Sequence, residues 1–326
     1  MTKTRVAVIR GGIGSEYDIS LETGKTALLS LPEDKYQPVD VLISRDGAWY
    51  VNGWPIRPVD LPEYADVAFI GLHGEFGEDG GIQKILDDIK FPYTGSGHIG
   101  SAVGINKDEA KKILKEAGMR VPYGIVIEND MDPVEAARLV FKKVSPTWII
   151  KPNEGGSSIG LSFARTFSEL VEGISRAQTF GRVLVEEYLK GKEATCGVID
   201  NFRRQDIYSL LPTEVIRSNS CPVWTYEGKY TESNNSVCPG RFSDKENEEL
   251  QILARRVHEI LNLRHYSRSD FIVTPRGIYV LEVNTLPGLT KTSPMPKALE
   301  AIGCSCGQFL DHLVNLALVD KKSMIT

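Results

Sequence analysis

The stretch YSRSDFIVTPRGIYVLEVNTLPG, residues 266–288, contains two runs of strand-like residues on either side of Pro275-Arg276-Gly277. This pattern predicts an antiparallel hairpin with a three-residue loop. With the turn centred on Arg276, Asp270 pairs with Glu282 and Arg268 pairs with Asn284. Because side chains alternate along a strand, these four should project from one face and leave an apolar layer on the other. That apolar layer is expected to contain Phe271, Val273, Tyr279, Leu281 and Val283.

The polar face of this hairpin is typical of a cation site. Two opposed carboxylates repel each other unless something neutralises them, and a divalent cation would do so. Oxygen ligands favour Mg²⁺ over zinc, and the neighbouring Arg268 suits phosphate oxygens that accompany the metal. An exposed polar face, on which Arg268 simply pairs with Asp270, explains the same residues equally well. The hairpin alone leaves both interpretations open.

A glycine-rich loop follows a strand expected at residues 147–150. The sequence IKPNEGGSSIG, residues 150–160, places Lys151 at the end of that strand and small residues after it. Small residues let backbone N–H groups approach phosphate oxygens, and a lysine adds a point charge. No G-K-[ST] closes the loop, so it is not a Walker motif. A phosphate cradle and an ordinary surface loop both fit.

The N-terminal part alternates between strand and helix patterns. Strands are expected at residues 5–9, 38–43 and 66–72 and a helix at 20–31, which predicts a parallel sheet. The turn-rich residues 92–97 mark the first domain boundary.

Two polar residues lie beyond the carboxyl ends of strands in this sheet, where open α/β sheets bind ligands. They are Glu16, in the turn GGIGSE, and His73, in GLHGEFGEDGG. The turn does not give G-x-G-x-x-G, so we expect no nicotinamide dinucleotide. A ligand site and a purely structural role for Glu16 and His73 both remain open.

The rest of the chain mixes helices with strands. A helix should begin near Asn106 and end at Gly118, and strands are expected at 124–127 and 182–186. The polar segment 220–238 is too long for an ordinary turn, and such segments are usually lids or binding loops. Further helices are expected at 245–261 and 307–318.

The composition indicates a soluble protein of two or three domains. The chain has 326 residues, of which 41% are hydrophobic and 25% charged, and a formal charge of −5. The sequence shows no basic stripe for nucleic acid, no apolar run of the roughly 20 residues that a membrane helix needs, and no signal peptide. Its five scattered cysteines fit reduced thiols. We therefore expect a cytoplasmic protein with neither a nucleic-acid nor a membrane partner.

Several segments, in this order, resemble the D-alanine–D-alanine ligase family over nearly the whole chain. They are GGIGSEYDISL (11–21), LHGEFGEDGGIQ (72–83), FPYTGSG (91–97), NK (106–107), IKPNEGGSSIG (150–160), LVEEYLKGKE (184–193), YEGKYTESNNSVCP (226–239), SRSDF (267–271) and LEVNTLPGLTKTSPMP (281–296).

The resemblance implies an α/β (α+β) three-domain ATP-grasp fold with a Rossmann-like N-terminal parallel sheet. The implied domains are an N-terminal substrate domain (1–96), a central ATP-grasp subdomain (97–186) and a C-terminal ATP-grasp subdomain with the metal site and lid (187–326). ATP would phosphorylate one D-alanine, and the amine of a second would attack the acyl phosphate to give the dipeptide of peptidoglycan. The resemblance also implies two Mg²⁺ ions, with Mn²⁺ as a substitute, and a homodimer.

The resemblance also assigns roles to individual residues. Nucleotide contacts would come from Lys107, Lys151, Ser157, Ser158, Glu186, Glu187, Leu189, Glu193 and Lys229. The metal ligands would be Asp270, Glu282 and Asn284. Glu16 would hold the first ammonium, with His73 nearby, and would form a hydrogen-bonded set with Ser157 and Tyr230. Arg268 and the Gly288 N–H would stabilise the oxyanion, and Ser293 would bind the second carboxylate.

Three positions depart from the family pattern. Gly14 stands where Ser is usual, Glu187 where Lys is usual beside the adenine, and Pro294 where Leu is usual after Ser293. The last change leaves D-serine or D-lactate as alternative second substrates, although Tyr230 favours an amine. A nucleotide-binding regulatory protein without turnover is the alternative from another class. The complete set of Arg268, Asp270, Glu282 and Asn284 argues against it.

Overall fold

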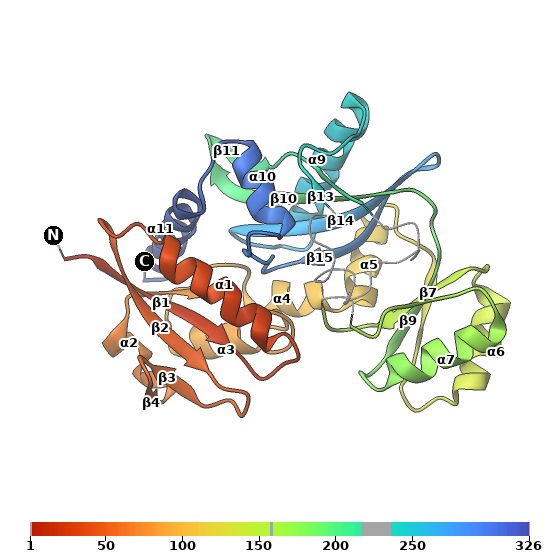
Figure 1. The fold of residues 1–326 in the computed structure, drawn as a ribbon, viewed down its shortest axis with the longest axis horizontal. Helices are drawn as coiled ribbons and strands as arrows, with labels where there is room; N and C mark the ends of the chain where they lie inside the picture. The colour runs from red at the N-terminus through yellow and green to blue at the C-terminus, as the bar shows by residue number, and fades with distance from the viewer. Residues whose placement is uncertain (1, 157–158, 217–235, 326) are drawn as a thin grey trace.

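The computed structural model describes residues 2–156, 159–216 and 236–325, with side chains up to Asp320. The described residues form three sheets, each beside its own buried hydrophobic cluster. Figure 1 shows the N-terminal sheet at one end, the smaller central sheet at the other, and the C-terminal sheet between and above them. The α/β architecture expected from the sequence is confirmed.

The N-terminal sheet is parallel at its centre, as predicted. Its strand order is β4-β3-β2-β1-β5, and β1 pairs in parallel with both β2 and β5. The run Val6–Ile9 is fully buried, which explains why an unbroken apolar strand was needed there. The elements are β1 (Thr4–Gly11), α1 (Tyr17–Ser30), β2 (Tyr36–Ile43), β3 (Trp49–Val51), β4 (Trp54–Ile56), α2 (Leu61–Tyr64), β5 (Val67–Ile70) and α3 (Gly81–Asp88).

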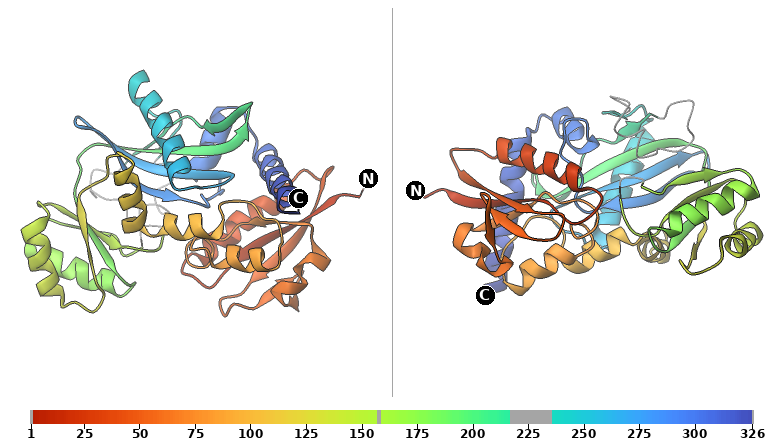
Figure 2. Two further views of the ribbon diagram at one scale, coloured as in Figure 1. Left: turned by 180° about the vertical axis from the view of Figure 1, so that it is seen from behind. Right: turned by 60° about the horizontal axis from the view of Figure 1, so that its bottom comes forward.

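The two C-terminal helices, α10 (Pro294–Ala301) and α11 (Cys306–Ile325), pack on this same N-terminal unit. Figure 2 shows α11 beside the N-terminal strands. Phe309, Leu310 and Leu313 are fully buried, and Tyr36 Oη donates to Asp311 Oδ1 at 2.7 Å. Within the described residues, no single helix is long and apolar enough to cross a membrane. Only α10 and α11 taken together satisfy that length and composition, and they meet at a bend of 101°.

The central sheet is antiparallel, with the strand order β6-β9-β7-β8, and two helices pack against it. A helix pair, α4 (His98–Ile105) and α5 (Lys107–Glu116), leads into it from the N-terminal unit. Gly118 follows α5 with φ +80°, as expected of a helix-ending glycine. The elements of this sheet are β6 (Gly124–Ile127), α6 (Pro133–Lys143), β7 (Trp148–Pro152), β8 (Ser162–Ala164), α7 (Phe167–Gln178) and β9 (Val183–Glu187).

The C-terminal sheet has the strand order β13-β12-β10-β14-β15, and β11 also pairs with β10. Helix α9 and the apolar face of α5 cover one side of it. The elements are β10 (Lys192–Phe202), β11 (Gln205–Ser209), β12 (Thr213–Val215), β13 (Ser236–Val237), α9 (Asp244–Ile260), β14 (Tyr266–Thr274) and β15 (Gly277–Asn284).

The hairpin of β14 and β15 differs from the prediction at its turn. Thr274 pairs with Gly277, so the loop has two residues, Pro275 and Arg276, rather than three. The register shifts between Asp270 and Phe271, because Leu281 is an extra residue in β15. This bulge compensates for the shorter loop. Asp270 therefore still pairs with Glu282, as predicted, and Arg268 with Asn284.

The bulge also changes which side chains form the apolar layer. Phe271, Val273 and Val283 are buried in the core, as predicted. The expectation for Tyr279 and Leu281 was wrong, because between the bulge and the turn the alternation of β15 is offset by one residue. Ile278 and Val280 occupy the core instead.

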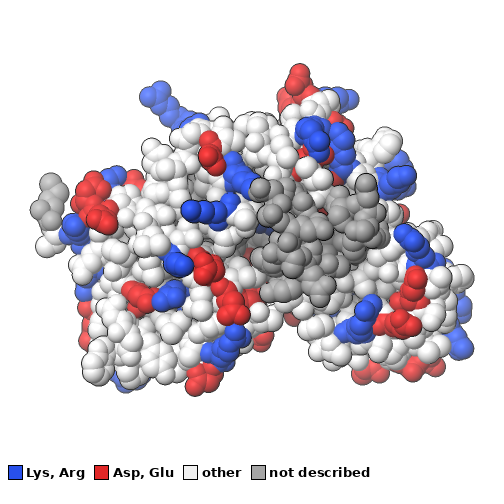
Figure 3. Space-filling view, in the orientation of Figure 1, with Lys and Arg blue, Asp and Glu red and all other residues white. Residues whose placement is uncertain are grey.

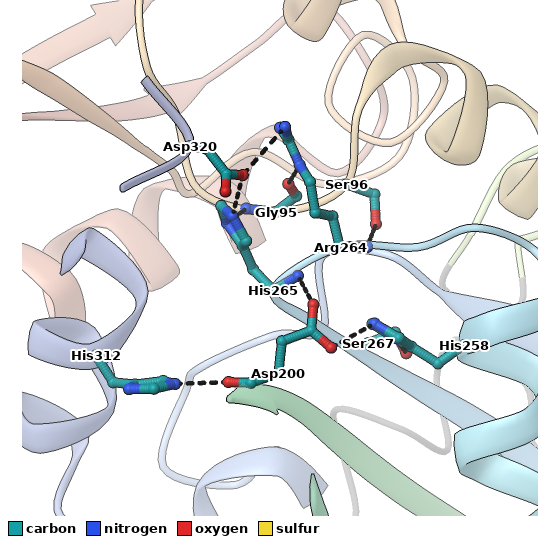
Figure 4. A network of polar contacts seen from close by, with 9 residues as sticks. All are labelled: Gly95, Ser96, Asp200, His258, Arg264, His265, Ser267, His312 and Asp320. Atoms are coloured by element: carbon teal, nitrogen blue, oxygen red, sulfur yellow. Dashed lines mark hydrogen bonds and ion pairs between the residues drawn. The ribbon is translucent and has the colours of Figure 1, made fainter. Parts of the chain in front are cut away.

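A polar network joins the N-terminal and C-terminal units (Figure 4). His265 accepts a hydrogen bond from Gly95 N at Nδ1 (3.0 Å), and its Nε2 lies 3.0 Å from Asp320 Oδ2 of α11. Asp200 accepts from His265 N at 2.5 Å and from His312 Nε2, through its backbone carbonyl, at 2.7 Å. These bonds fix the end of β10 and the start of β14 relative to the turn between α3 and α4.

Candidate active site

A large open cleft, with about 1080 Å³ of empty space, lies between the central and C-terminal sheets. On the face of the molecule that Figure 3 shows, acidic and basic side chains are interspersed over the described surface. The walls of the cleft include most of the described residues that were predicted to bind nucleotide or metal, whereas the predicted metal ligand Asn284 lines a smaller neighbouring pocket. These lining residues are Lys107, Lys151, Glu186, Glu187, Leu189, Glu193, Arg268, Asp270 and Glu282.

The carboxylate of Asp270, in the cleft, is held by three neighbouring side chains. It accepts hydrogen bonds from Arg268 Nε (3.2 Å) and Nη2 (3.3 Å), from Thr195 Oγ1 (2.5 Å) and from Asn284 Nδ2 (3.2 Å). The pairing of β14 with β15 places Glu282 opposite it. The structure thus brings together the three side chains predicted to bind metal. Two carboxylates and an amide are a hard oxygen donor set, which fits Mg²⁺.

Arg268 stays charged although it is buried. Burial alone would lower the pKa of its guanidinium, but Asp270, Glu282 and Glu78 together raise it above its ordinary value. A permanent positive charge therefore lies beside the carboxylate pair, where an anionic transition state would need it.

Lysines line the opposite wall of the cleft. Lys107, at the start of α5, donates to Gly155 O at 2.6 Å, and Lys151, at the end of β7, lies 2.9 Å from Glu186 Oε2. Burial lowers the pKa of Lys107. Burial also opposes the charge of Lys151, but Glu186 and Glu282 keep its pKa above the usual value. Both lysines line the cleft, and their role toward phosphate oxygens stays a prediction.

The segment after β9 forms the inner end of the cleft. Leu189 is buried at 4% exposure and supplies apolar surface. Glu187, one of the departures from the family pattern, accepts a hydrogen bond from Tyr123 N at 3.0 Å. Part of its carboxylate is thus directed at the backbone of the segment before β6.

Glu16 lies where the N-terminal sheet meets the glycine-rich loop after β7. It is buried, and a Cβ atom on Gly74 would fall 2.1 Å from its Oε2, while one on Gly156 would fall 2.7 Å away. Glycine is therefore required at both positions, because any larger residue would displace the carboxylate. Gly74 adds a backbone φ of +64°, which favours glycine independently.

His73 and Ser293 lie on either side of Gly288. A Cβ atom on Gly288 would be 3.1 Å from Ser293 Oγ and 3.9 Å from His73 Cε1. The ring of His73 lies 2.7 Å from Thr23 Oγ1, and burial lowers its pKa to about 4, so it is neutral near pH 7. The structure thus brings together His73, Gly288 and Ser293, three residues to which the family resemblance assigns substrate contacts.

Two buried charged residues beside this site were not predicted. Glu78 accepts from Gly74 N and from Leu286 N, both at 3.0 Å, and so joins the N-terminal sheet to the loop after β15. Burial, with Glu16 nearby, raises its pKa to about 7. Lys111 pairs with Glu186 behind the cleft. Its spacing of four residues from Lys107 puts both lysines on one side of a helix but predicts neither its burial nor its partner.

Four predicted residues, Ser157, Ser158, Lys229 and Tyr230, lie outside the described residues. So does most of the predicted lid at 220–238. Their assigned roles remain sequence predictions.

The chain is similar to known proteins over nearly its whole length. A family model described as D-ala D-ala ligase C-terminus matches residues 113–315. The D-alanine–D-alanine ligase of Syntrophobacter fumaroxidans is 37% identical over 325 residues, which cover 98% of this chain and 99% of that protein.

Two solved structures have a similar fold. The D-alanine–D-alanine ligase from Bacillus anthracis complexed with ATP has a TM-score of 0.77 at 26% identity, over 98% of this chain and 99% of that one. The VanG D-Ala:D-Ser ligase from Enterococcus faecalis has a TM-score of 0.84 at 28% identity, over 97% and 100%. Given the family-model match and the identity over nearly its full length, this chain belongs to the D-alanine–D-alanine ligase family and has its ATP-grasp fold.

Proposed function

We propose that this protein joins two D-alanine molecules to D-alanyl-D-alanine with ATP, through an acyl phosphate, for peptidoglycan precursor synthesis. The observation that carries the proposal is the convergence of three groups on one cleft. Lys107 and Lys151 line one wall, the carboxylates of Asp270 and Glu282 with Arg268 line the other, and Glu16 closes the end nearest the N-terminal sheet.

The reaction does not require a covalent intermediate with the protein. A carboxylate oxygen of the first D-alanine attacks the γ-phosphorus and ADP leaves, and the second amine then attacks the acyl carbon and phosphate leaves. Lys107 and Lys151 hold phosphate oxygens, while Glu186, Glu187, Leu189 and Glu193 surround the nucleoside. Phosphoryl transfer of this kind depends on positioning and charge neutralisation.

Mg²⁺ supplies part of that neutralisation when it is bound, and Asp270, Glu282 and Asn284 are the residues that would hold it. Arg268 and the Gly288 N–H stabilise the oxyanion that forms when the amine attacks. Glu16 orients the first ammonium, and Ser293 the carboxylate of the second substrate.

The domain limits 1–96, 97–186 and 187–326 form part of the proposal. Sheet membership supports them, because β1–β5, β6–β9 and β10–β15 fall almost wholly within the three ranges. Helices α10 and α11 return from the third range to pack on the first.

The proposal is tested by ADP release from Mg²⁺-ATP across a panel of D-alanine, D-serine, D-lactate and L-alanine, with product identification. D-alanine alone should support rapid ADP release and yield the dipeptide. Nucleotide binding without ADP release would instead support a regulatory protein. If a product of D-alanine with D-serine or D-lactate forms faster than D-alanyl-D-alanine, the second substrate is that other molecule. Sedimentation and cell fractionation test the predicted homodimer and cytoplasmic location.

A further inference from the structure

Lys111 is a buried charge that lies behind the nucleotide cleft. It is 7% exposed and belongs to the buried face of α5, together with Ala110 and Leu114. Lys107, one helical turn earlier, is among the described residues that line the cleft, whereas Lys111 is not. Lys107 thus lines the cleft, whereas Lys111 lies on the buried face of the same helix.

Lys111 and Lys151 share one carboxylate. Glu186 Oε1 pairs with Lys111 Nζ, and Oε2 lies 2.9 Å from Lys151 Nζ. The carboxylate has little freedom to turn, because its side chain is 3% exposed and lies against Gly124, its partner across β6 and β9. A Cβ atom on Gly124 would fall 2.7 Å from Glu186 Cγ.

Glu186 and Lys111 depend on each other for their charges, because burial lowers the pKa of Lys111 to about 7 and the carboxylate of Glu186 opposes this. Burial would raise the pKa of Glu186, but Lys111 and then Lys151 hold it below the usual range. A buried carboxylate that loses its partners becomes very unfavourable. Lys151 lines the cleft, where a nucleotide phosphate could attract it, whereas Lys111 is buried and is not among the described residues of the lining.

We propose that Lys111 is the counter-ion that stays with Glu186 when the nucleotide binds, so that Lys151 can exchange Glu186 for a phosphate oxygen. Lys111 is thus a positioning residue for nucleotide binding. This inference rests on the proposed ATP-dependent function.

The exchange predicts a specific pattern in a double-mutant cycle. Without Lys111, Lys151 is the cation that remains paired with the buried Glu186 among the described residues, and it is less available to phosphate. Lys111→Met should therefore weaken ADP binding about tenfold and adenosine binding much less, because only ADP offers phosphates. Adding Glu186→Gln removes the carboxylate that retains Lys151. ADP binding by the double variant should then be tighter than that of Lys111→Met alone.

The test is calorimetric titration of the whole protein with ADP and with adenosine at fixed Mg²⁺, supported by thermal unfolding. Lys111→Arg should restore most of the ADP affinity, because a guanidinium also pairs with carboxylate. Lys112→Met is the matched control, since Lys112 is exposed on the same helix and pairs with Asp108. It should leave both affinities unchanged.

The outcomes separate the inference from the proposed function. Unchanged ADP binding by Lys111→Met, equal losses for ADP and adenosine, or a double variant no better than the single one would overturn the counter-ion role. If Lys111→Met does not fold, the double variant should still fold and bind ADP within about tenfold of wild type, and its failure overturns the inference. Failure of the wild type to bind ADP would instead contradict the proposed ATP-dependent function.

Discussion

Asp270 and Glu282 face each other across β14 and β15, and they are the last pair in register before the bulge at Leu281. Arg268, Thr195 and Asn284 all donate hydrogen bonds to Asp270. These donors offset part of the repulsion between two opposed carboxylates, so the hairpin can form before any cation is bound. The same arrangement leaves the pair directed into the cleft.

Glu282→Gln should lower turnover by about a hundredfold, about 2.7 kcal/mol, because it removes a full charge from the proposed metal ligands. The melting temperature without Mg²⁺ should stay equal or rise, because the change relieves the repulsion with Asp270. Steady-state kinetics over a Mg²⁺ series and thermal unfolding measure the two effects. Glu248→Gln, an exposed change on α9, is the control. Turnover within tenfold of wild type at saturating Mg²⁺ would contradict the assignment.

Val280 and Leu281 are neighbours that the bulge places in different environments. Val280 is 1% exposed in the core, whereas Leu281 lines the cleft. Val280→Ala should therefore lower the free energy of unfolding by about 2 kcal/mol with little change in the KM for ATP. Leu281→Ala should raise the KM for ATP and affect stability less. Urea unfolding and initial rates distinguish them, and the reverse pattern would show that the bulge is misplaced.

Ser293 precedes α10 but makes no side-chain bond to that helix, and its Oγ instead lies 2.8 Å from Thr290 Oγ1. Ser293→Ala should leave stability nearly unchanged and raise the KM for D-alanine at the acceptor site. Ser305→Ala is the matched control, because Ser305 Oγ accepts from Gln308 N at 3.2 Å. It should cost about 1 kcal/mol of stability and leave the KM unchanged. Equal KM values for D-alanine in the two variants would contradict the assignment of Ser293 to the acceptor site.

His265 should make the protein less stable in acid. Burial holds its pKa below the ordinary 6.5, although Asp320 and Asp200 nearby favour the charged ring and Arg264 opposes it. Because the pKa of His265 is lower in the folded state than in the unfolded state, the neutral ring favours folding. This stabilisation is fully present at pH values above the unfolded pKa and is lost as the pH falls through the folded pKa. Protonation would also remove the Nδ1 acceptor that binds Gly95 N.

The unfolding free energy should therefore fall as the pH drops below about 6.5. His265→Gln should be less stable at neutral pH and show a shallower pH dependence. His98→Gln, in an exposed ring on α4, should keep the wild-type dependence. Urea unfolding at a series of pH values measures this, and identical slopes for wild type and His265→Gln would disprove the assignment.

The sequence by itself was sufficient to predict much of the site. Alternation placed Asp270, Glu282, Arg268 and Asn284 on one strand face, and strand-end positions placed Glu16 and His73 at one sheet edge. These predictions succeeded because they depend on local periodicity and on the common direction of parallel strands. The family resemblance then supplied roles that periodicity cannot give.

Only the tertiary structure decided how these parts meet. A two-residue loop with a bulge gives the same pairing at Asp270 as a three-residue loop without one, so the sequence could not distinguish the two arrangements. For this reason Tyr279 and Leu281 were wrongly assigned to the apolar face. Lys111 and Glu78 look like ordinary surface charges in sequence. They become part of the site because Glu186 lies on β9, 75 residues from Lys111, and Leu286 lies 208 residues from Glu78. Burial and long-range pairing set the charge of such groups, and no local pattern encodes either.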